Sequence, residues 1–305
     1  MRPLLPLLAA SLLAPTLGCS GIAARVAAGA LSSGGDVYAS DDDPELVRQA
    51  VPFGLKTMEG LLASQPRDER LLESLAAGFT QYGYAFVAAD ADAADLGGRL
   101  EEAARLRTRA RRLFLRARGY GLRALDERRG GLGGRLAAAT DSRALPALLA
   151  VATREDVPAL YWTASAWALA ISSAKGDMEL VAELPVPVAM MERALALDEA
   201  WGDGAIHEFF IAYLGGRGAA GGGGPAKVRP HLDRALALSR GEKLGPKVAW
   251  AEGVLVQAQD RAAFVATLGE VLAADPEQPA RYRLANVLAR RRARLLLDHV
   301  DDLFL

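Results

Sequence analysis

Residues 40–47 read Ser40-Asp41-Asp42-Asp43-Pro44-Glu45-Leu46-Val47 and carry the start signal of an α-helix. Asp43 can cap the helix, Pro44 suits its first position, and Glu45 complements the positive helix end. Apolar residues then recur at helical spacing until the run stops before Pro66: Leu46, Val47, Ala50, Val51, Leu55, Met58, Leu61 and Leu62. A second apolar face follows over 71–86, so the two segments predict an antiparallel helical hairpin.

Further helical patterns follow along the chain, at 101–126, 158–174, 188–197, 206–214, 228–238, 248–258, 262–273 and 280–297. Ala, Leu and Arg are abundant in the composition, and aromatic residues make up only 6% of it. No convincing alternating stretch of β-branched residues, which would predict a strand, occurs. The sequence therefore predicts an all-α protein.

Three predicted helices end in similar segments, Ala194–Asp198, Ala235–Ser239 and Val271–Pro276. These segments start 41 and 36 residues apart, near the spacing of about 34 residues in tetratricopeptide repeats. Helix pairs that cannot bury their apolar faces alone stack side by side and leave a concave surface. We therefore predict a tetratricopeptide-like helical-repeat solenoid of antiparallel helix pairs.

The first residues have the pattern of an export signal. Arg2 precedes an apolar run over 4–17, which is too short and too interrupted by prolines to predict a membrane span. This run ends in Thr16-Leu17-Gly18-Cys19-Ser20, which resembles a bacterial lipobox, where the cysteine is acylated and becomes the new N-terminus. The alternative is an ordinary secreted protein whose only cysteine falls there by accident.

Cleavage at the lipobox predicts three parts of the chain. Residues 1–18 are the expected lipoprotein signal peptide and 19–37 a flexible tether. Residues 38–305 are a single all-α repeat domain, whose halves meet at a glycine-rich linker near 130–134. Lipidation of Cys19 predicts a periplasmic protein anchored to a membrane, and the serine after the cysteine favours the outer membrane over the inner.

Charge is balanced overall and uneven locally. The 36 basic and 37 acidic residues leave a net charge of -1, which gives no general attraction to nucleic acid. The predicted helix over 101–126 carries Arg105, Arg109, Arg112 and Arg116 on one face. This face is either solvated and paired with Asp-rich segments elsewhere, or it contacts an anionic partner or lipid headgroups.

The acidic triplet Asp41, Asp42 and Asp43 also has two interpretations. Helix capping and solvation account for three aspartates directly before a helix. The other interpretation is a contact with a partner or a cation. We keep the three residues as candidates for such a contact.

Signals for catalysis and metal binding are weak. His207-Glu208 lacks the second histidine four residues on that a zinc-protease helix needs, because Ile211 stands there. The only cysteine belongs to the lipobox, and no Gly-x-Ser-x-Gly elbow occurs. Residues 216–221 match the dinucleotide fingerprint, but glycines and Pro225 follow where a helix should open. We therefore expect no enzyme, no cofactor and no metal site.

Aromatic residues are rare in this chain, yet they gather on three of the predicted helices. At helical spacing such residues form either packed core or the lining of a cleft for an apolar or amphipathic ligand. The candidates for a ligand cleft are Tyr82, Phe86, Tyr161, Trp162, Trp167, His207 and Phe209.

Several stretches together resemble one family, and they lie at 38–47, 52–56, 78–87, 161–167, 206–210, 283–286 and 291–296. The most specific piece is the start Asp41-Asp42-Asp43-Pro44-Glu45-Leu46-Val47. With these stretches the chain resembles the TatT family, the T-component lipoproteins of TRAP (tripartite ATP-independent periplasmic) transporters. None of the matching stretches is a catalytic motif.

The resemblance implies an all-α fold of tetratricopeptide-like repeats, a lipid anchor and a homotrimer. It also implies association with a periplasmic solute-binding protein, which delivers its ligand to a membrane permease. A pore and an adjoining hydrophobic cleft in this family imply a hydrophobic or amphipathic solute. Our leading hypothesis is therefore an accessory component of a TRAP-type uptake system. The alternative is a generic tetratricopeptide-like scaffold lipoprotein for envelope assembly, without a solute ligand.

Overall fold

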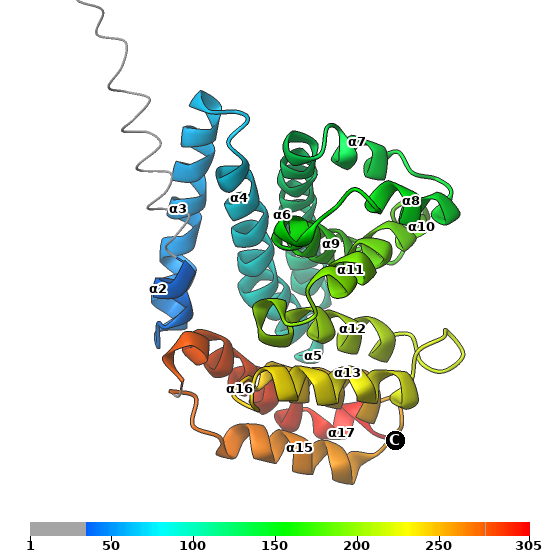
Figure 1. Cartoon of the computed structure of the whole chain (residues 1–305). Helices are drawn as coiled ribbons and strands as arrows, with labels where there is room; N and C mark the ends of the chain where they lie inside the picture. The colour runs from blue at the N-terminus through cyan, green and yellow to red at the C-terminus, as the bar shows by residue number, and fades with distance from the viewer. Residues whose placement is uncertain (1–34, 278) are drawn as a thin grey trace, which may run out of the picture.

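The computed structural model describes residues 35–277 and 279–305. Every regular element in these residues is a helix, which confirms the predicted all-α class (Figure 1). The predicted signal peptide, Cys19 and most of the predicted tether lie outside the described residues. The repeat arrangement of the helix pairs stays a prediction.

The helices form two units joined through α12. The short helix α2 (Gly35–Ala39) comes first and occupies the end of the predicted tether. The N-terminal unit contains α3 (Pro44–Ser64), α4 (Glu69–Tyr82), the π-helical turn η1 (Gly83–Ala88), α5 (Ala89–Leu96), α6 (Leu100–Arg128), α7 (Leu132–Ala137), η2 (Ser142–Ala144), α8 (Leu145–Leu149), η3 (Arg154–Asp156), α9 (Val157–Ser172), α10 (Met178–Ala182) and α11 (Pro185–Leu197).

The C-terminal unit follows the short turn η4 (Trp201–Gly204) and lies below the N-terminal unit in Figure 1. It contains α12 (Ala205–Gly215), α13 (Pro225–Leu238), α14 (Gly245–Trp250), the π-helical turn η5 (Ala251–Leu255), α15 (Arg261–Ala273), η6 (Ala280–Tyr282), α16 (Arg283–Asp298) and α17 (Val300–Leu303). The short helices α2, α5, α7, α8, α10 and α17 were not predicted from the sequence.

Helix α6 is the centre of the N-terminal unit, where it packs against α4, α5, α7 and α9. Its buried face is made mostly of small residues, which lets neighbouring backbones approach closely. At Gly121 an added Cβ atom would lie 2.0 Å from the Thr163 hydroxyl oxygen of α9. Glycine at this position is therefore what allows α9 to lie so close to α6.

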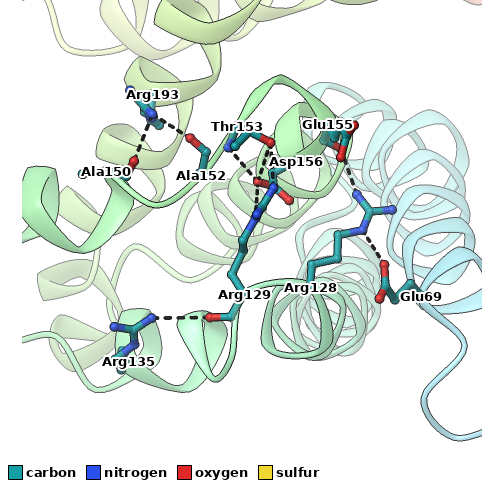
Figure 2. Close-up of polar contacts among 10 residues, drawn as sticks. All are labelled: Glu69, Arg128, Arg129, Arg135, Ala150, Ala152, Thr153, Glu155, Asp156 and Arg193. Carbon is teal, nitrogen blue, oxygen red and sulfur yellow. Dashed lines mark hydrogen bonds and ion pairs between the residues drawn. The ribbon is translucent and has the colours of Figure 1, made fainter.

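The C-terminal end of α6 is tied to its neighbours by two consecutive arginines (Figure 2). Arg128 Nε donates to Glu69 Oε2 of α4 at 2.9 Å. Arg129 Nε donates to Asp156 Oδ2 of η3 at 2.7 Å, and its Nη2 donates to the Thr153 hydroxyl oxygen at 2.6 Å. Asp156 is 0% exposed, so its negative charge is compensated inside the protein by Arg129.

The glycine run at 130–134 connects α6 to α7 inside one hydrophobic cluster, and the predicted meeting of two halves of the domain there stays a prediction. Gly130 and Gly131 adopt left-handed conformations with φ of 52° and 80°, and they turn the chain back along α6. Helix α7 then begins at Leu132, which is fully buried in the same core. An added Cβ at Gly133 would lie 2.0 Å from the Leu122 carbonyl oxygen, so α7 packs directly on α6.

The hydrophobic core divides at α12. One cluster runs from Val47 to Phe210, while two smaller clusters hold the C-terminal unit together. Helix α12 belongs to both sides, because Phe210 joins the first cluster and Ile211 joins a C-terminal one. The last long helix, α16, returns to pack against α2 and α3, so the C-terminal unit also touches the start of the N-terminal unit.

Candidate functional site

The acidic triplet at the start of α3 has a structural explanation for two of its members. Asp43 Oδ1 accepts hydrogen bonds from the backbone N–H groups of Glu45 and Leu46, and therefore caps the helix as predicted. Asp41 Oδ1 accepts from the Asp43 N–H at 2.8 Å. Asp42 is exposed. A contact between these residues and a partner or cation stays a prediction.

Four of the predicted cleft residues lie in the packed interior: Tyr82, Phe86, Trp167 and His207. Tyr82 and Phe86 pack against each other, with ring centroids 5.6 Å apart. Trp167 Nε1 donates to Glu183 Oε2 at 2.7 Å, and this hydrogen bond fixes the ring between α9 and α10. These side chains stabilise the core of the N-terminal unit or its junction with α12.

The other three candidates, Tyr161, Trp162 and Phe209, are partly exposed. The Tyr161 ring lies 4.9 Å from Trp162 and 4.5 Å from Trp201, measured between ring centroids. Phe209 stacks on Tyr213 at 6.0 Å on helix α12. The structure therefore brings Tyr161 and Trp162 together with Trp201, which the sequence analysis did not select, and provides an apolar surface with polar ring edges.

Trp201 is positioned by an unusual turn between α11 and α12. Gly202, Asp203 and Gly204 all have positive φ values, of 59°, 51° and 91°. At Gly204 an added Cβ atom would lie 3.0 Å from the Ala235 Cα atom, so the turn needs glycine there. Aspartate is one of the few residue types that adopt this left-handed conformation, and the Asp203 side chain also accepts a hydrogen bond from the Tyr282 hydroxyl at 2.5 Å.

Tyr84 on η1 lies near charged groups of the C-terminal unit. It is 63% exposed, yet burial raises its pKa to about 12. Glu252 of the C-terminal unit raises this pKa further, whereas Arg292 lowers it. Solvent therefore reaches Tyr84 although groups of both units surround it. Tyr84 stands only two residues after the buried Tyr82, so helical spacing places it on the opposite side of the helix.

Tyr161 belongs to the same surroundings. Burial raises its pKa, and the Glu208 carboxylate and the Tyr84 phenol raise it further. Tyr84, Tyr161 and Glu208 come from η1, α9 and α12, and so from both units. We refer to Tyr84, Tyr161, Trp162, Trp201 and Phe209 together as the aromatic surface.

Charged side chains lie beside the aromatic surface and are paired with one another. Arg292 of α16 contacts Glu252 of η5 at 2.5 Å and Asp92 of α5 at 3.3 Å, both measured between Nη2 and a carboxylate oxygen. Burial raises the pKa of Asp92, and the nearby Glu252 raises it as well, while Arg292 lowers it. Lys243 Nζ lies 2.9 Å from Glu208 Oε1. The region therefore combines an apolar surface with fixed charges, an arrangement that suits an amphipathic ligand.

Two histidines that lie far apart in the sequence meet in the C-terminal unit. His207 Nδ1 is 2.9 Å from His231 Nδ1, and His207 Nε2 is 3.2 Å from Glu199 Oε1. Because a carboxylate only accepts, His207 carries its proton on Nε2, and His231 Nδ1–H donates to His207 Nδ1. Burial lowers the pKa of both histidines. Sequence spacing gave no sign of this pair, which arises only because α13 packs against α12.

Two further features bear on function. The glycine-rich segment 216–221 follows helix α12, and so it lacks the preceding strand that a dinucleotide site requires. Within residues 35–277 and 279–305, no cluster of three or more His, Cys, Asp or Glu side chains is arranged to hold a metal ion. In the same residues, no helix has the length and hydropathy to cross a membrane.

Comparison with known proteins gives two matches. A protein of Treponema pallidum (strain Nichols), described as uncharacterized, is 29% identical over 271 residues, which cover 88% of this chain and 83% of that protein. The family model described as TRAP transporter T-component matches residues 40–304, from the segment before α3 to the end of the last helix. The chain therefore belongs to the TRAP transporter T-component family.

Proposed function

We propose that this protein is a lipid-anchored accessory component of a TRAP-type solute uptake system on the periplasmic side of the envelope. The family match over residues 40–304 carries the proposal. The lipobox-like segment that ends at Cys19 supplies the anchor, and several acyl chains suffice because each buried methylene contributes about 0.8 kcal/mol. The outer membrane is the proposed location.

The remaining parts of the proposal concern assembly. We infer that the helix pairs stack as tetratricopeptide-like repeats, that the protein forms a homotrimer, and that it binds a periplasmic solute-binding protein. Membership of the T-component family supports each of these points. The closure of α16 onto α2 and α3 supports a repeat array that curves back on itself.

The aromatic surface is the proposed site for a hydrophobic or amphipathic solute. Tyr161, Trp162 and Trp201 form one continuous group of rings, and solvent reaches Tyr84 nearby. Paired charges at Arg292 and Glu208 border this surface. A ligand with an apolar body and a polar head can therefore place its body on the aromatic rings and its head beside these charges.

Binding to a TRAP solute-binding protein tests the transport role. We expect the purified chain to bind the solute-binding protein of a TRAP system from the same organism, and we expect both proteins to be recovered together after crosslinking in intact cells. Cys19→Ser should release the chain from membranes without abolishing this binding. Repeated failure to recover the solute-binding protein favours the scaffold hypothesis.

Fluorescence of the amphipathic dye anilinonaphthalene sulfonate tests the aromatic surface. Replacement of Trp162 by Ala should weaken dye binding about tenfold, because aromatic rings dominate the binding energy of such surfaces. Phe53→Ala is the matched control, since Phe53 is a 79% exposed aromatic residue on α3, away from the aromatic surface. Equal dye binding by both variants contradicts a ligand site at Trp162.

A further inference from the structure

The arginines in and just after helix α6 fall into two groups. The members of the first group are paired with neighbouring segments: Arg107 with Asp95, Arg111 with Asp177, Arg116 with Glu59, Arg118 with Glu183, Arg128 with Glu69 and Glu73, and Arg129 with Asp156 through ion pairs, and Arg123 with the Pro66 carbonyl oxygen through a hydrogen bond. Of the four arginines that the sequence places on one face, only Arg116 forms such an ion pair within the described residues.

The second group consists of Arg105, Arg109 and Arg112. All three are exposed, and their spacing of four and three residues places them on one face of α6. None of them forms an ion pair with another residue of the part of the chain that the structure describes. We call these three residues the arginine row. Glu101 stands one turn before the row, which still leaves the row with a net positive charge.

The surroundings of the arginine row are also exposed and partly apolar. Arg111 lies next to the row on α6 and pairs with Asp177, which caps α10. Helix α10 therefore flanks the row, and it begins with Met178, which is 71% exposed. Lys175 is exposed just before Asp177 and adds a further positive charge. Arginine and methionine are the residue types that protein–protein interfaces select, so this composition fits a protein partner.

The position of the arginine row fits the same partner. Arg116, the next residue of this face, pairs with Glu59 of α3, and Arg111 pairs with Asp177 near α10. The row therefore lies on the surface between α3 and α10. Helix α10 is far from α2, where the described chain begins, and the two stand on opposite sides of the N-terminal unit in Figure 1. The α10 flank of the row therefore faces away from α2.

We propose that the arginine row, with Lys175 and Met178, is a docking surface for an acidic face of a partner protein. Like charges one turn apart on a helix repel each other, and an acidic partner surface replaces this repulsion by attraction. Such a row also steers a negatively charged protein toward the surface and speeds its association. The inference rests on the proposed function for the identity of the partner, which is then the TRAP solute-binding protein.

A triple charge reversal tests the docking surface. The variant is R105E/R109E/R112E, and the matched control R70E/R240E/R294E changes three other exposed arginines by the same total charge. Association with the purified solute-binding protein should be roughly tenfold slower or more for the row variant, and close to wild type for the control. The difference should shrink at high salt, because screening weakens steering. Both variants should keep the wild-type circular dichroism spectrum.

The possible results separate this inference from the proposed function. If the wild type and both variants bind the solute-binding protein equally, the docking surface is wrong and the transport role stands. If the wild type does not bind that protein, the transport role fails, and binding of polyglutamate by the wild type but not by the row variant still supports an acidic polypeptide partner. If the row variant loses binding only to phosphatidylglycerol vesicles, the row contacts lipid and the inference is overturned.

Discussion

The arginines at the two ends of helix α6 have different surroundings. At the C-terminal end, Arg129 pairs with Asp156, a carboxylate that is 0% exposed. At the N-terminal end, Arg105, Arg109 and Arg112 are exposed and form no ion pair with the described residues. The residue type and the helix are the same, so the difference comes from the neighbours that the fold supplies. An arginine whose partner is buried is tied to stability, whereas an exposed row remains available for binding.

The largest effect is expected at the buried end. Arg129→Ala removes the cation that compensates Asp156 and leaves a carboxylate buried without a positive partner. Breaking a buried ion pair in this way costs about 3–5 kcal/mol of unfolding free energy. Urea denaturation followed by circular dichroism measures the loss.

Arg112→Ala provides the control for this prediction. Arg112 is exposed on the same helix, so its removal should change the unfolding free energy by no more than about 0.5 kcal/mol. A double variant of Arg129→Ala and Asp156→Asn should lose less than the sum of the two single variants, because the two side chains interact directly. Equal losses of unfolding free energy in Arg129→Ala and Arg112→Ala would contradict the idea that the burial of Asp156 makes Arg129 more important for stability than Arg112.

The next effect is expected where α7 folds back on α6. Gly133→Ala places a methyl group at 2.0 Å from the Leu122 carbonyl oxygen, so the backbone must shift. Overpacking of this kind costs about 1–3 kcal/mol, which a shift of the thermal midpoint reports. Gly134→Ala is the control on the same helix, since its nearest contact is at 3.8 Å to an Asp126 side-chain oxygen. Two similar midpoints would contradict the close packing of α7 on α6.

The sequence predicted the long helices well because their signals are local. Asp43 caps α3, and the apolar spacing that predicted 101–126 gave nearly the full extent of α6, Leu100–Arg128. Short helices such as α7 and α10 were missed because a few residues carry little periodicity and depend on tertiary packing. Composition alone predicts a linker near 130–134, whereas close contact with Leu122 requires glycine at that point.

The candidate site was predicted only in part. Tyr161, Trp162 and Phe209 are partly exposed as a cleft lining requires, but Tyr82, Phe86 and Trp167 are core. Helical spacing alone cannot separate these cases, because both faces of a helix between two layers carry apolar residues. Trp201 was not selected, since the left-handed turn that follows it has no simple sequence signal. Tyr84 was not selected because only the fold shows which groups of the other unit lie near it.

The pair His207 and His231 differs from both ends of α6, because its contribution to stability depends on pH. Burial lowers the pKa of His207 and His231 below the ordinary value of 6.5. The unfolded chain therefore binds more protons, so this contribution to stability is complete above about pH 6.5 and is lost as the pH falls through that value. The thermal midpoint should fall between about pH 7.5 and about pH 5.5.

His231→Gln should reduce this pH dependence, because it removes one of the two titrating rings and keeps a polar side chain beside His207. Glu199 and Arg234 lie next to the pair and stay charged over this range. Arg129 lies outside the histidine pair, so Arg129→Ala should leave the difference between the two thermal midpoints close to the wild-type value. If the thermal midpoint of His231→Gln changes with pH as much as that of the wild type, other groups cause the pH dependence.

The smallest effect is expected at the exposed end of α6, and its sign is opposite. Arg109 stands four residues after Arg105 and three before Arg112, so Arg109→Gln removes two like-charge contacts on one helix face. Each such contact costs about 0.2–0.5 kcal/mol, so the unfolding free energy should rise slightly at low ionic strength. Added salt should abolish the gain, because the charges are exposed and screened. A loss of stability on Arg109→Gln at low salt would mean that Arg109 already has an anionic partner within the folded chain, and that the arginine row is not free to bind another protein.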